Sequence, residues 1–400
     1  MRFFYLDPGL HSHVGHHANT CRVITTELRR RGIETTVAGS VFLTPELQSE
    51  LGARPFFNFY TYHVTAGDPI ADWLSVFQRG VGATVKDLSR LPAMTPDDVV
   101  FLNTAQPTQF MSLVTWLNRL PAPERPRAVI EFGLDAGLEV KQTEGMLTFE
   151  PARDDPRGIL YRYVGLSIPP SIRPHLFLKT FDPFASQGYA FITGLETGVL
   201  PLPQQAHAPL RKKAGKRPIV IGILGDQRPD KGYKKVPAIM TALLARHEHI
   251  RFLVHNAAPT GMPGTQDLVR EIAKADARVT VDERPADGAL WQSLLSDTDL
   301  MLCPYNPTRY VASYSAVAVE ALANGIPMVG PANTTLSRFA ADNSGAMATF
   351  GPYEAAAIIG ATQHAIQNFD ALAEAAFDAA AAWNLHDRKA MLLDCILGKL

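Results

Sequence analysis

Two cations stand three residues apart in the segment GILGDQRPDKGYKK, directly after an apolar run that predicts a buried strand. Arg228 offers a planar fork of donors to phosphate oxygens, and Lys231 offers a compact positive charge. Because open α/β sheets bind ligands where their strands end, this pair favours a diphosphate clamp over two solvated charges at a helix start. The GxxxxGK[ST] pattern does not occur, and the spacing of Gly222 and Gly225 alone does not define a dinucleotide site.

A single carboxylate, Glu320, interrupts the otherwise uncharged segment SYSAVAVEALANG, which predicts a buried helix. Ser313 or Ser315 can cap that helix, which leaves free backbone N–H groups and a partial positive charge that suit a phosphate. Glu320 follows Ser315 by about one and a half helical turns. We therefore expect it to reach a group beyond the phosphate, such as the vicinal hydroxyls of a ribose.

Four histidines, His11, His13, His16 and His17, surround Gly15 in the segment HSHVGHH. Imidazoles at these spacings are able to ligate zinc, but no cysteine or carboxylate cluster completes a closed site nearby in the sequence. We predict no metal site here. Ordinary loop histidines are one alternative, and a role beside a bound ligand is another.

Polar residues also follow two other predicted strands. Asn103, Thr104 and Gln106 come after the run VVFL, and Glu131 and Asp135 lie in VIEFGLDAG. Strands of a parallel sheet end at the same edge, so we expect these side chains to face a ligand-binding edge. Capping of a helix or turn is an equally good interpretation of each one.

The elements that would position these residues alternate between strand and helix. Apolar runs of strand length are each followed by an amphipathic helix, first from the N-terminus and again from PIVIGILG onward. Three prolines and five basic residues between the two halves predict a linker. The sequence thus predicts α/β domains with parallel sheets, divided as 1–200, a linker at 201–217, 218–375, and a closing C-terminal helix at 376–400.

Composition narrows the class of protein. The 400 residues exceed one ordinary domain, and 46% hydrophobic with 19% charged residues is typical of a globular chain. A formal net charge of -1 gives no general attraction for nucleic acid. We expect a cytoplasmic protein, because its three cysteines are far apart and no run is apolar enough for a transmembrane segment.

The second half of the chain resembles the donor domain of GT-B-fold glycosyltransferases, particularly the retaining family 4 type. The resemblance rests on three segments in order: RPDKG, a strand ending in CPY, and SYSAVAVEALANGIPMVGP. The resemblance covers nearly the whole chain and implies two Rossmann-like domains facing each other across a cleft. It assigns Arg228 and Lys231 to the donor diphosphate and Glu320 to the ribose. It also puts Gly15 and His16 in a loop beside the donor phosphates, with His17 on the acceptor side.

The sequence departs from the family's motif of two glutamates at one position. The first of these glutamates lies eight positions before the second, and it would fall on Ala312 when the second is Glu320. The family's Gly-Phe-Gly is replaced by Ser313, Tyr314 and Ser315, whose backbone amides remain suited to a phosphate. In many relatives a histidine lies near Glu131 and assists with the donor sugar, and we place Glu131 beside His16 as a catalytic candidate.

The resemblance predicts a hexosyltransferase-type enzyme that moves a sugar from a nucleotide-diphosphate sugar to an acceptor, with retention and with neither metal nor cofactor. The acceptor, which Asn103, Thr104, Gln106 and His17 would contact, is not specified: it could be a glycan, a lipid-linked glycan, a protein or a small molecule. Because of Ala312, the alternative is an inactive protein that binds a nucleotide or glycan as a partner or scaffold. An epimerase or phosphorylase on the same fold is a third interpretation.

Overall fold

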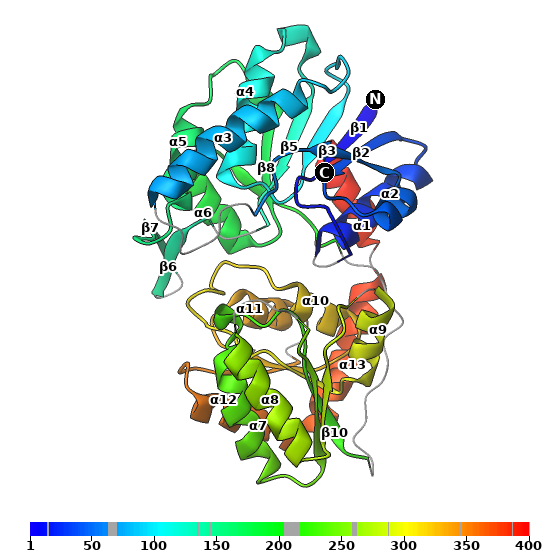
Figure 1. Ribbon diagram of the computed structural model, residues 1–400, viewed down its shortest axis with the longest axis vertical. Coiled ribbons are helices and arrows are strands. Elements are labelled where there is room, and N and C mark those ends of the chain that lie inside the picture. The colour runs from blue at the N-terminus through cyan, green and yellow to red at the C-terminus, as the bar shows by residue number, and fades with distance from the viewer. Residues whose placement is uncertain are drawn as a thin grey trace. The chain divides into compact units, whose positions relative to one another are not determined.

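The structure is a computed structural model, and it describes residues 1–13, 16–62, 70–133, 136–143, 146–203, 217–257, 262–286, 288–343, 346–385 and 387–399, without the side chains of residues 70 and 142. The chain forms two compact units (Figure 1). The N-terminal unit comprises Met1–Pro203 and Arg388–Leu400, and the C-terminal unit comprises Gln204–Asp387. Gly15, Asp135 and residues 204–216 of the predicted linker lie outside the described residues.

The N-terminal unit is built on a parallel sheet in the order β3-β2-β1-β4-β5-β8-β9. An antiparallel hairpin, β6–β7, is separate from this sheet. The strands are β1 (Arg2–Leu6), β2 (Glu34–Ser40), β3 (Ala53–Phe57), β4 (Val99–Leu102), β5 (Arg127–Glu131), β6 (Leu138–Thr143), β7 (Met146–Pro151), β8 (Leu176–Thr180) and β9 (Thr197–Val199). The helices are α1 (His16–Arg30), α2 (Pro45–Leu51), α3 (Ile70–Leu88), α4 (Pro107–Arg119), α5 (Arg157–Leu166), α6 (Pro183–Thr193) and α14 (Arg388–Leu397).

Strand β1 shows why this sheet is covered on both faces. Its side chains alternate between two cores, with Phe4 and Leu6 in one and Phe3 and Tyr5 in the other. The first core is shared with α3, α4 and α5, and the second with α1 and α14. A strand buried on both faces reads as a continuous apolar run, which is why the sequence predicted these strands well.

The C-terminal unit repeats the same plan with a parallel sheet in the order β12-β11-β10-β13-β14-β15. Its strands are β10 (Ile219–Ile223), β11 (Ile250–His255), β12 (Val279–Asp282), β13 (Leu300–Leu302), β14 (Met328–Pro331) and β15 (Met347–Phe350). Its helices are α7 (Val236–Leu244), α8 (Pro263–Ala275), α9 (Gly288–Asp297), α10 (Ala316–Ala323), α11 (Thr335–Asp342), α12 (Ala355–Gln367) and α13 (Phe369–Leu385). The predicted pair of Rossmann-like sheets is confirmed.

The C-terminal tail differs from the single closing helix predicted over residues 376–400. It contains the second half of α13 and, after a break, α14. Trp383 of α13 packs on Phe339 within the C-terminal unit, whereas Leu392, Leu393 and Ile396 of α14 join the core of the N-terminal unit. The apolar stripe of α14 therefore completes a domain that lies almost 200 residues earlier in the chain.

Both sheets are held in the same way at their amino ends. Asp98, just before β4, accepts hydrogen bonds from the backbone N–H of Arg2 and from its guanidinium. Asp299, just before β13, likewise accepts from the backbone N–H of Val220 and from the guanidinium of Arg217. Both carboxylates are almost fully buried. Each pair ties the first strand of its unit to the fourth.

Candidate functional site

Each sheet has a switch point, where the strand order turns from descending to ascending. It lies between β1 and β4 in the N-terminal unit and between β10 and β13 in the C-terminal unit. At a switch point the loops after the two strands leave in opposite directions, and the space outside the carboxyl ends suits a ligand. The candidate residues in each unit cluster around this edge.

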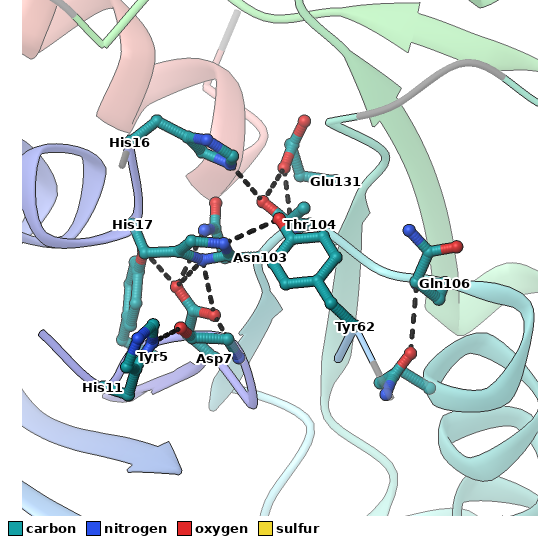
Figure 2. A network of polar contacts seen from close by, with 12 residues as sticks. Tyr5, Asp7, His11, His16, His17, Tyr62, Asn103, Thr104, Gln106 and Glu131 are labelled. Carbon is teal, nitrogen blue, oxygen red and sulfur yellow. Dashed lines mark hydrogen bonds and ion pairs between the residues drawn. The ribbon is translucent and has the colours of Figure 1, made fainter. Parts of the chain in front are cut away.

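In the N-terminal unit, the first array of polar groups runs from Asp7 through His17 to Tyr62 (Figure 2). Asp7 follows β1 directly and is fully buried. Its carboxylate lies 2.9 Å from His17 Nδ1 and accepts hydrogen bonds from the Gly9 N–H and Asn103 Nδ2 at 2.9 Å each. His17 Nε2 lies 2.8 Å from the Tyr62 hydroxyl.

A second array runs beside the first. The His16 ring stacks on that of His17, with the ring centroids 4.3 Å apart, and its Nε2 lies 3.1 Å from Thr104 Oγ1. The Thr104 backbone N–H donates to Glu131 Oε2 at 2.8 Å. Thr104 has φ of 50°, which is an uncommon conformation for a β-branched residue. Backbone strain of this kind persists where the surroundings impose it, and it is frequent at functional sites.

Glu131 is the last residue of β5, and it is fully buried. Successive residues of a strand point to opposite faces, and both faces of β5 are covered, with Ile130 in one core and Val129 in the other, so Glu131 is buried on the face that it shares with Val129. Burial raises its pKa to about 8, against the opposing effect of the Thr104 N–H. Glu131 is therefore mostly protonated at neutral pH. Its Oε1, and Oδ1 of the equally buried Asn103, have no hydrogen-bond partner among the described residues.

Gln106 caps α4 rather than joining the network. Its side chain accepts from the backbone N–H of Gln109, and Gln109 Oε1 accepts from the backbone N–H of Gln106. Capping was the alternative interpretation of this residue. Gln106 also lines a small, solvent-open hollow together with Phe59, Thr61, Trp73, Val76, Phe77, Pro107, Thr108 and Leu160.

The four histidines of the 11–17 segment do not gather around one point. His11 Nδ1 lies 3.0 Å from the Gly9 carbonyl, and His13 Nε2 lies 3.6 Å from Glu50. Across the described ranges, no group of three or more histidine, cysteine or acidic side chains is arranged to hold a metal ion.

In the C-terminal unit, the Gly225 turn after β10 brings Lys231 and α10 together. Gly225 has φ of 95°, and a Cβ at this position would lie 3.1 Å from both Lys231 Nζ and Val317 Cγ2. Glycine thus leaves room for the ammonium group. Burial, and then repulsion by Arg228, lower the pKa of Lys231 to about 8. Lys231 makes no ion pair with any residue that the structure describes.

The Arg228 side chain is held by one carboxylate, Asp230, and one phenol, Tyr310. Its guanidinium donates to Asp230 Oδ2 at 3.0 Å and to the Tyr310 hydroxyl at 3.4 Å. Burial alone would lower the pKa of Arg228, but Tyr310, Asp230 and Asp226 together raise it. Gly232 lets the loop after β13 come close, because a Cβ at 232 would overlap the Pro304 carbonyl. Arg228 and Lys231 are therefore fixed beside each other.

Helix α10 begins as predicted, with Ser315 as its N-cap. The Ser315 hydroxyl accepts from the Ala318 N–H at 3.4 Å, and the Ser313 carbonyl accepts from the Thr335 hydroxyl at 2.6 Å. Glu320 is partly exposed, but its Oε2 is buried without a hydrogen-bond partner in the described part of the chain. Burial raises the pKa of Glu320 to about 7. This oxygen is suited to accept from a hydroxyl donor.

Sequence reasoning missed four residues of these two clusters. Asp7, Tyr62, Asp230 and Tyr310 were not singled out as functional candidates. Asp7 was predictable in principle, because a carboxylate directly after the first strand occupies the switch point. The other three become relevant only through contacts between loops that are distant in the sequence.

No family model matches the chain, and no curated protein matches it by sequence. Solved structures do match. HepE from Anabaena, in complex with UDP, has a TM-score of 0.59 at 14% identity, over 100% of this chain and 99% of that one. Sucrose-phosphate synthase from Thermosynechococcus elongatus has a TM-score of 0.63 at 13% identity, over 100% and 97%. The UDP-forming α,α-trehalose-phosphate synthase from Burkholderia vietnamiensis has a TM-score of 0.64 at 10% identity, over 100% and 96%.

These likenesses extend over both units and establish the fold, which is the GT-B fold with its two Rossmann-like domains. No helix in the described part of the chain has the length and apolar character needed to cross a membrane.

Proposed function

We propose that this protein is a glycosyltransferase that transfers a sugar from a nucleotide-diphosphate donor to an acceptor. The observation that carries the proposal is Lys231, a partly exposed lysine that makes no ion pair among the described residues and lies beside Arg228 at the Gly225 turn. Desolvation of a cation without a direct ion pair is costly, so this position favours a bound anion. The first turn of α10 adds backbone N–H groups to the same place.

The structural neighbours support the donor class. One of them is described as a complex with UDP-glucose, and another as a UDP-forming synthase. Within the proposal, Arg228 and Lys231 bind the diphosphate, the backbone around Ser313, Tyr314 and Ser315 meets a phosphate, and Glu320 accepts from the ribose. Arg228 and Lys231 neutralise the departing diphosphate, so that the reaction needs no metal.

The N-terminal unit would hold the acceptor. Its switch point presents His16, with His17 and Thr104 behind it, and the hollow near Gln106 lies at the start of the helix that follows β4. Retention of configuration, which the resemblance implies, is part of the proposal and is tested by the anomeric configuration of the product.

A second candidate is a protein of the same fold that binds a nucleotide or glycan without turnover. Ala312 favours it, because the resemblance puts a carboxylate there near the hydroxyls of the donor sugar. This candidate predicts tight nucleotide binding and no release of nucleoside diphosphate during long incubation with any donor.

The test is release of nucleoside diphosphate from a panel of uridine, guanosine and adenosine diphosphate sugars, with Glu320→Ala as the variant. The matched control is Glu248→Ala, which removes an exposed carboxylate from the same unit. We expect turnover of at least one donor by the wild type, and about a 10- to 100-fold lower kcat/KM for Glu320→Ala, the loss of one hydrogen bond to a charged group. Equal behaviour of both variants would contradict the role of Glu320.

A further inference from the structure

Three side chains of the C-terminal unit, Arg228, Asp230 and Tyr310, form a hydrogen-bond triangle. Arg228 Nη2 donates to Asp230 Oδ2 at 3.0 Å and to the Tyr310 hydroxyl at 3.4 Å, and that hydroxyl donates to the same Asp230 oxygen at 3.3 Å. A guanidinium only donates, a carboxylate only accepts, and a hydroxyl does both. The kind of group at each corner therefore fixes the direction of all three hydrogen bonds.

The hydrogen-bond triangle uses one nitrogen of the guanidinium and leaves the other two available. Nη2 carries two hydrogens, and one goes to each of its partners. Nε and Nη1 of Arg228 make no hydrogen bond with any residue that the structure describes, and Asp226 Oδ2 lies 3.9 Å from Nε, beyond hydrogen-bond distance. The Arg228 side chain is 44% exposed. An anion at this turn would therefore meet the N–H groups of Nε and Nη1.

Backbone hydrogen bonds fix both partners of Arg228. The Asp230 carbonyl accepts from the Asn306 N–H at 2.8 Å, which ties the turn after β10 to the loop after β13. Tyr310 is buried, and its carbonyl accepts from the Thr335 N–H at the start of α11 at 2.9 Å. The two loops meet because β10 and β13 are neighbours in the sheet. The long arginine side chain is thus held by two groups whose backbones are anchored.

Tyr310 also connects the two cations of this site. Its aromatic ring packs on that of Tyr305, with the centroids 4.7 Å apart, and Lys231 Nζ lies 5.6 Å from the Tyr305 centroid. A cation at this distance is attracted by the face of an aromatic ring. The hydroxyl of one tyrosine and the ring of the other therefore hold Arg228 and Lys231 beside each other.

The benefit of holding Arg228 lies in binding more than in folding. Ion pairs of exposed side chains are screened by water and contribute little to the free energy of unfolding. An arginine side chain loses much rotamer freedom when it is fixed on a ligand. A side chain that the protein already holds loses less of this freedom on binding, so its affinity for the ligand is higher.

We propose that Asp230 and Tyr310 are positioning residues that orient Arg228 for the diphosphate of the donor. Arg228 contacts the anion through Nε and Nη1, and its two partners act through Arg228 without touching the nucleotide. This inference rests on the proposed function, which assigns Arg228 to the diphosphate. It adds which residues set the orientation of that side chain, and it concerns groups of the C-terminal unit alone.

The decisive experiment is a double-mutant cycle between Tyr310→Phe and Arg228→Gln in the full-length protein. Titration calorimetry gives Kd for uridine, guanosine and adenosine diphosphates, and the tightest of the three is measured with every variant. Tyr310→Phe keeps the ring that packs on Tyr305 and removes only the hydroxyl. We expect it to raise Kd about 3- to 10-fold in the wild-type background, the effect of one hydrogen bond. In the Arg228→Gln background it should raise Kd less than about 1.5-fold.

Two controls separate this effect from a general disturbance of the site. Tyr353→Phe removes a phenolic hydroxyl from the same unit, where the ring packs on Lys235, and should match the wild type in Kd. The nucleoside without phosphates should bind equally to the wild type and to Tyr310→Phe, because Arg228 would not contact it. The melting temperature of Tyr310→Phe should stay close to that of the wild type.

Asp230 is tested with two variants that lack the same charge. Asp230→Asn keeps an oxygen that accepts from Arg228, whereas Asp230→Ala has none. Because both remove one negative charge beside the diphosphate, the Coulomb effect cancels in the ratio of their Kd values. We expect Kd to be about 3- to 10-fold higher for Asp230→Ala than for Asp230→Asn. Asp267→Ala and Asp267→Asn, where the carboxylate pairs with Arg270 instead, should have equal Kd values.

The outcomes distinguish the proposal from its alternatives. Equal losses for Tyr310→Phe in both backgrounds would overturn it, because neither a structural role nor a direct contact with the nucleotide requires Arg228. Equal Kd values for the two Asp230 variants would overturn the role of Asp230, even if Tyr310→Phe did not fold. If the wild type binds none of the three nucleoside diphosphates, the proposed function fails instead.

Discussion

The two units share one sheet topology and differ at the carboxyl ends of their strands. At the switch point of the N-terminal unit lie two carboxylates, two imidazoles and an amide, in two hydrogen-bonded arrays that meet where the imidazole rings stack. At the same place in the C-terminal unit lie two cations and a glycine turn beside a helix N-terminus. The first set is equipped to move protons, and the second to bind an anion.

The amino ends of the same strands are alike. Asp98 with Arg2, and Asp299 with Arg217, make the same set of hydrogen bonds in their respective units. The comparison indicates that one edge of each sheet stabilises the domain, whereas the proposed chemistry lies at the opposite edge. The predictions below test this division, and the largest effects are expected at the carboxyl ends.

The largest effect is expected for Lys231→Ala. The variant loses the ammonium group at the Gly225 turn, and kcat/KM for the donor should fall about 10²- to 10³-fold, as when one group that stabilises developing negative charge is removed. Lys234→Ala is the matched control, because Lys234 is exposed on the same loop. Steady-state kinetics of nucleoside diphosphate release would measure both, and similar losses in the two variants would argue against an anion site.

The next effect concerns Glu320 and pH. Its pKa of about 7 means that the carboxylate is mostly neutral below pH 6 and mostly ionised above pH 8. Because the ionised form is the better acceptor for hydroxyl donors, nucleotide affinity should rise by up to about tenfold between those values. Titration calorimetry at several pH values would measure this, with Glu320→Gln as the comparison. A slope of the same size in Glu320→Gln would rule out Glu320 as its source.

At the amino ends, Asp98→Ala and Asp299→Ala should destabilise the protein without affecting donor turnover per folded molecule. Each substitution leaves buried donors without their acceptor, at a cost of about 2 kcal/mol in the free energy of unfolding. Urea denaturation measures this cost, and Asp267→Ala, which removes an exposed carboxylate, should cost less than about 0.5 kcal/mol. A loss of turnover in the folded Asp98→Ala protein would contradict the division between the two edges.

The contribution of Asp98 to the free energy of unfolding should also depend on pH. Hydrogen bonds from Arg2 and Thr95 outweigh burial and hold the pKa of Asp98 well below its ordinary 3.8. A depressed carboxyl pKa adds stability above the pKa of the unfolded chain, and this stability is lost as pH falls. The difference in unfolding free energy between the wild type and Asp98→Ala should therefore be full at pH 6 and shrink below about pH 4.

The last prediction concerns Glu131→Gln and affects only the pH dependence of stability. The folded protein holds the Glu131 proton up to about pH 8, whereas the unfolded chain releases it near 4.5. The free energy of unfolding of the wild type should therefore fall between pH 5 and 8 by about 1 kcal/mol per pH unit because of Glu131, and Glu131→Gln should lack this decrease. Thermal unfolding of both proteins across this range would measure the difference. Parallel pH profiles would show that Glu131 is ionised in the folded state.

The sequence predicted β1, β4, β5 and β10, because each is buried on two faces and reads as a continuous apolar run. It also predicted the start of α10, since Ser315 is an ordinary N-cap. It singled out Arg228 and Lys231 after a predicted strand and Glu320 within a predicted helix. Their roles toward a nucleotide stay predictions. The tail was predicted less well, because composition identifies α13 and α14 as helices but not the domain that each one joins.

The sequence by itself determined the elements and the kinds of chemistry available, because local periodicity and residue type are properties of short segments. Only the tertiary structure decided which groups meet. Asp7 and Asn103 come together because β1 and β4 are neighbours in the sheet, and Tyr62 reaches His17 from the segment after β3. Burial was also decided there: the sequence placed Glu131 at a strand end, and the fold buries its carboxyl group fully and thereby raises its pKa to about 8.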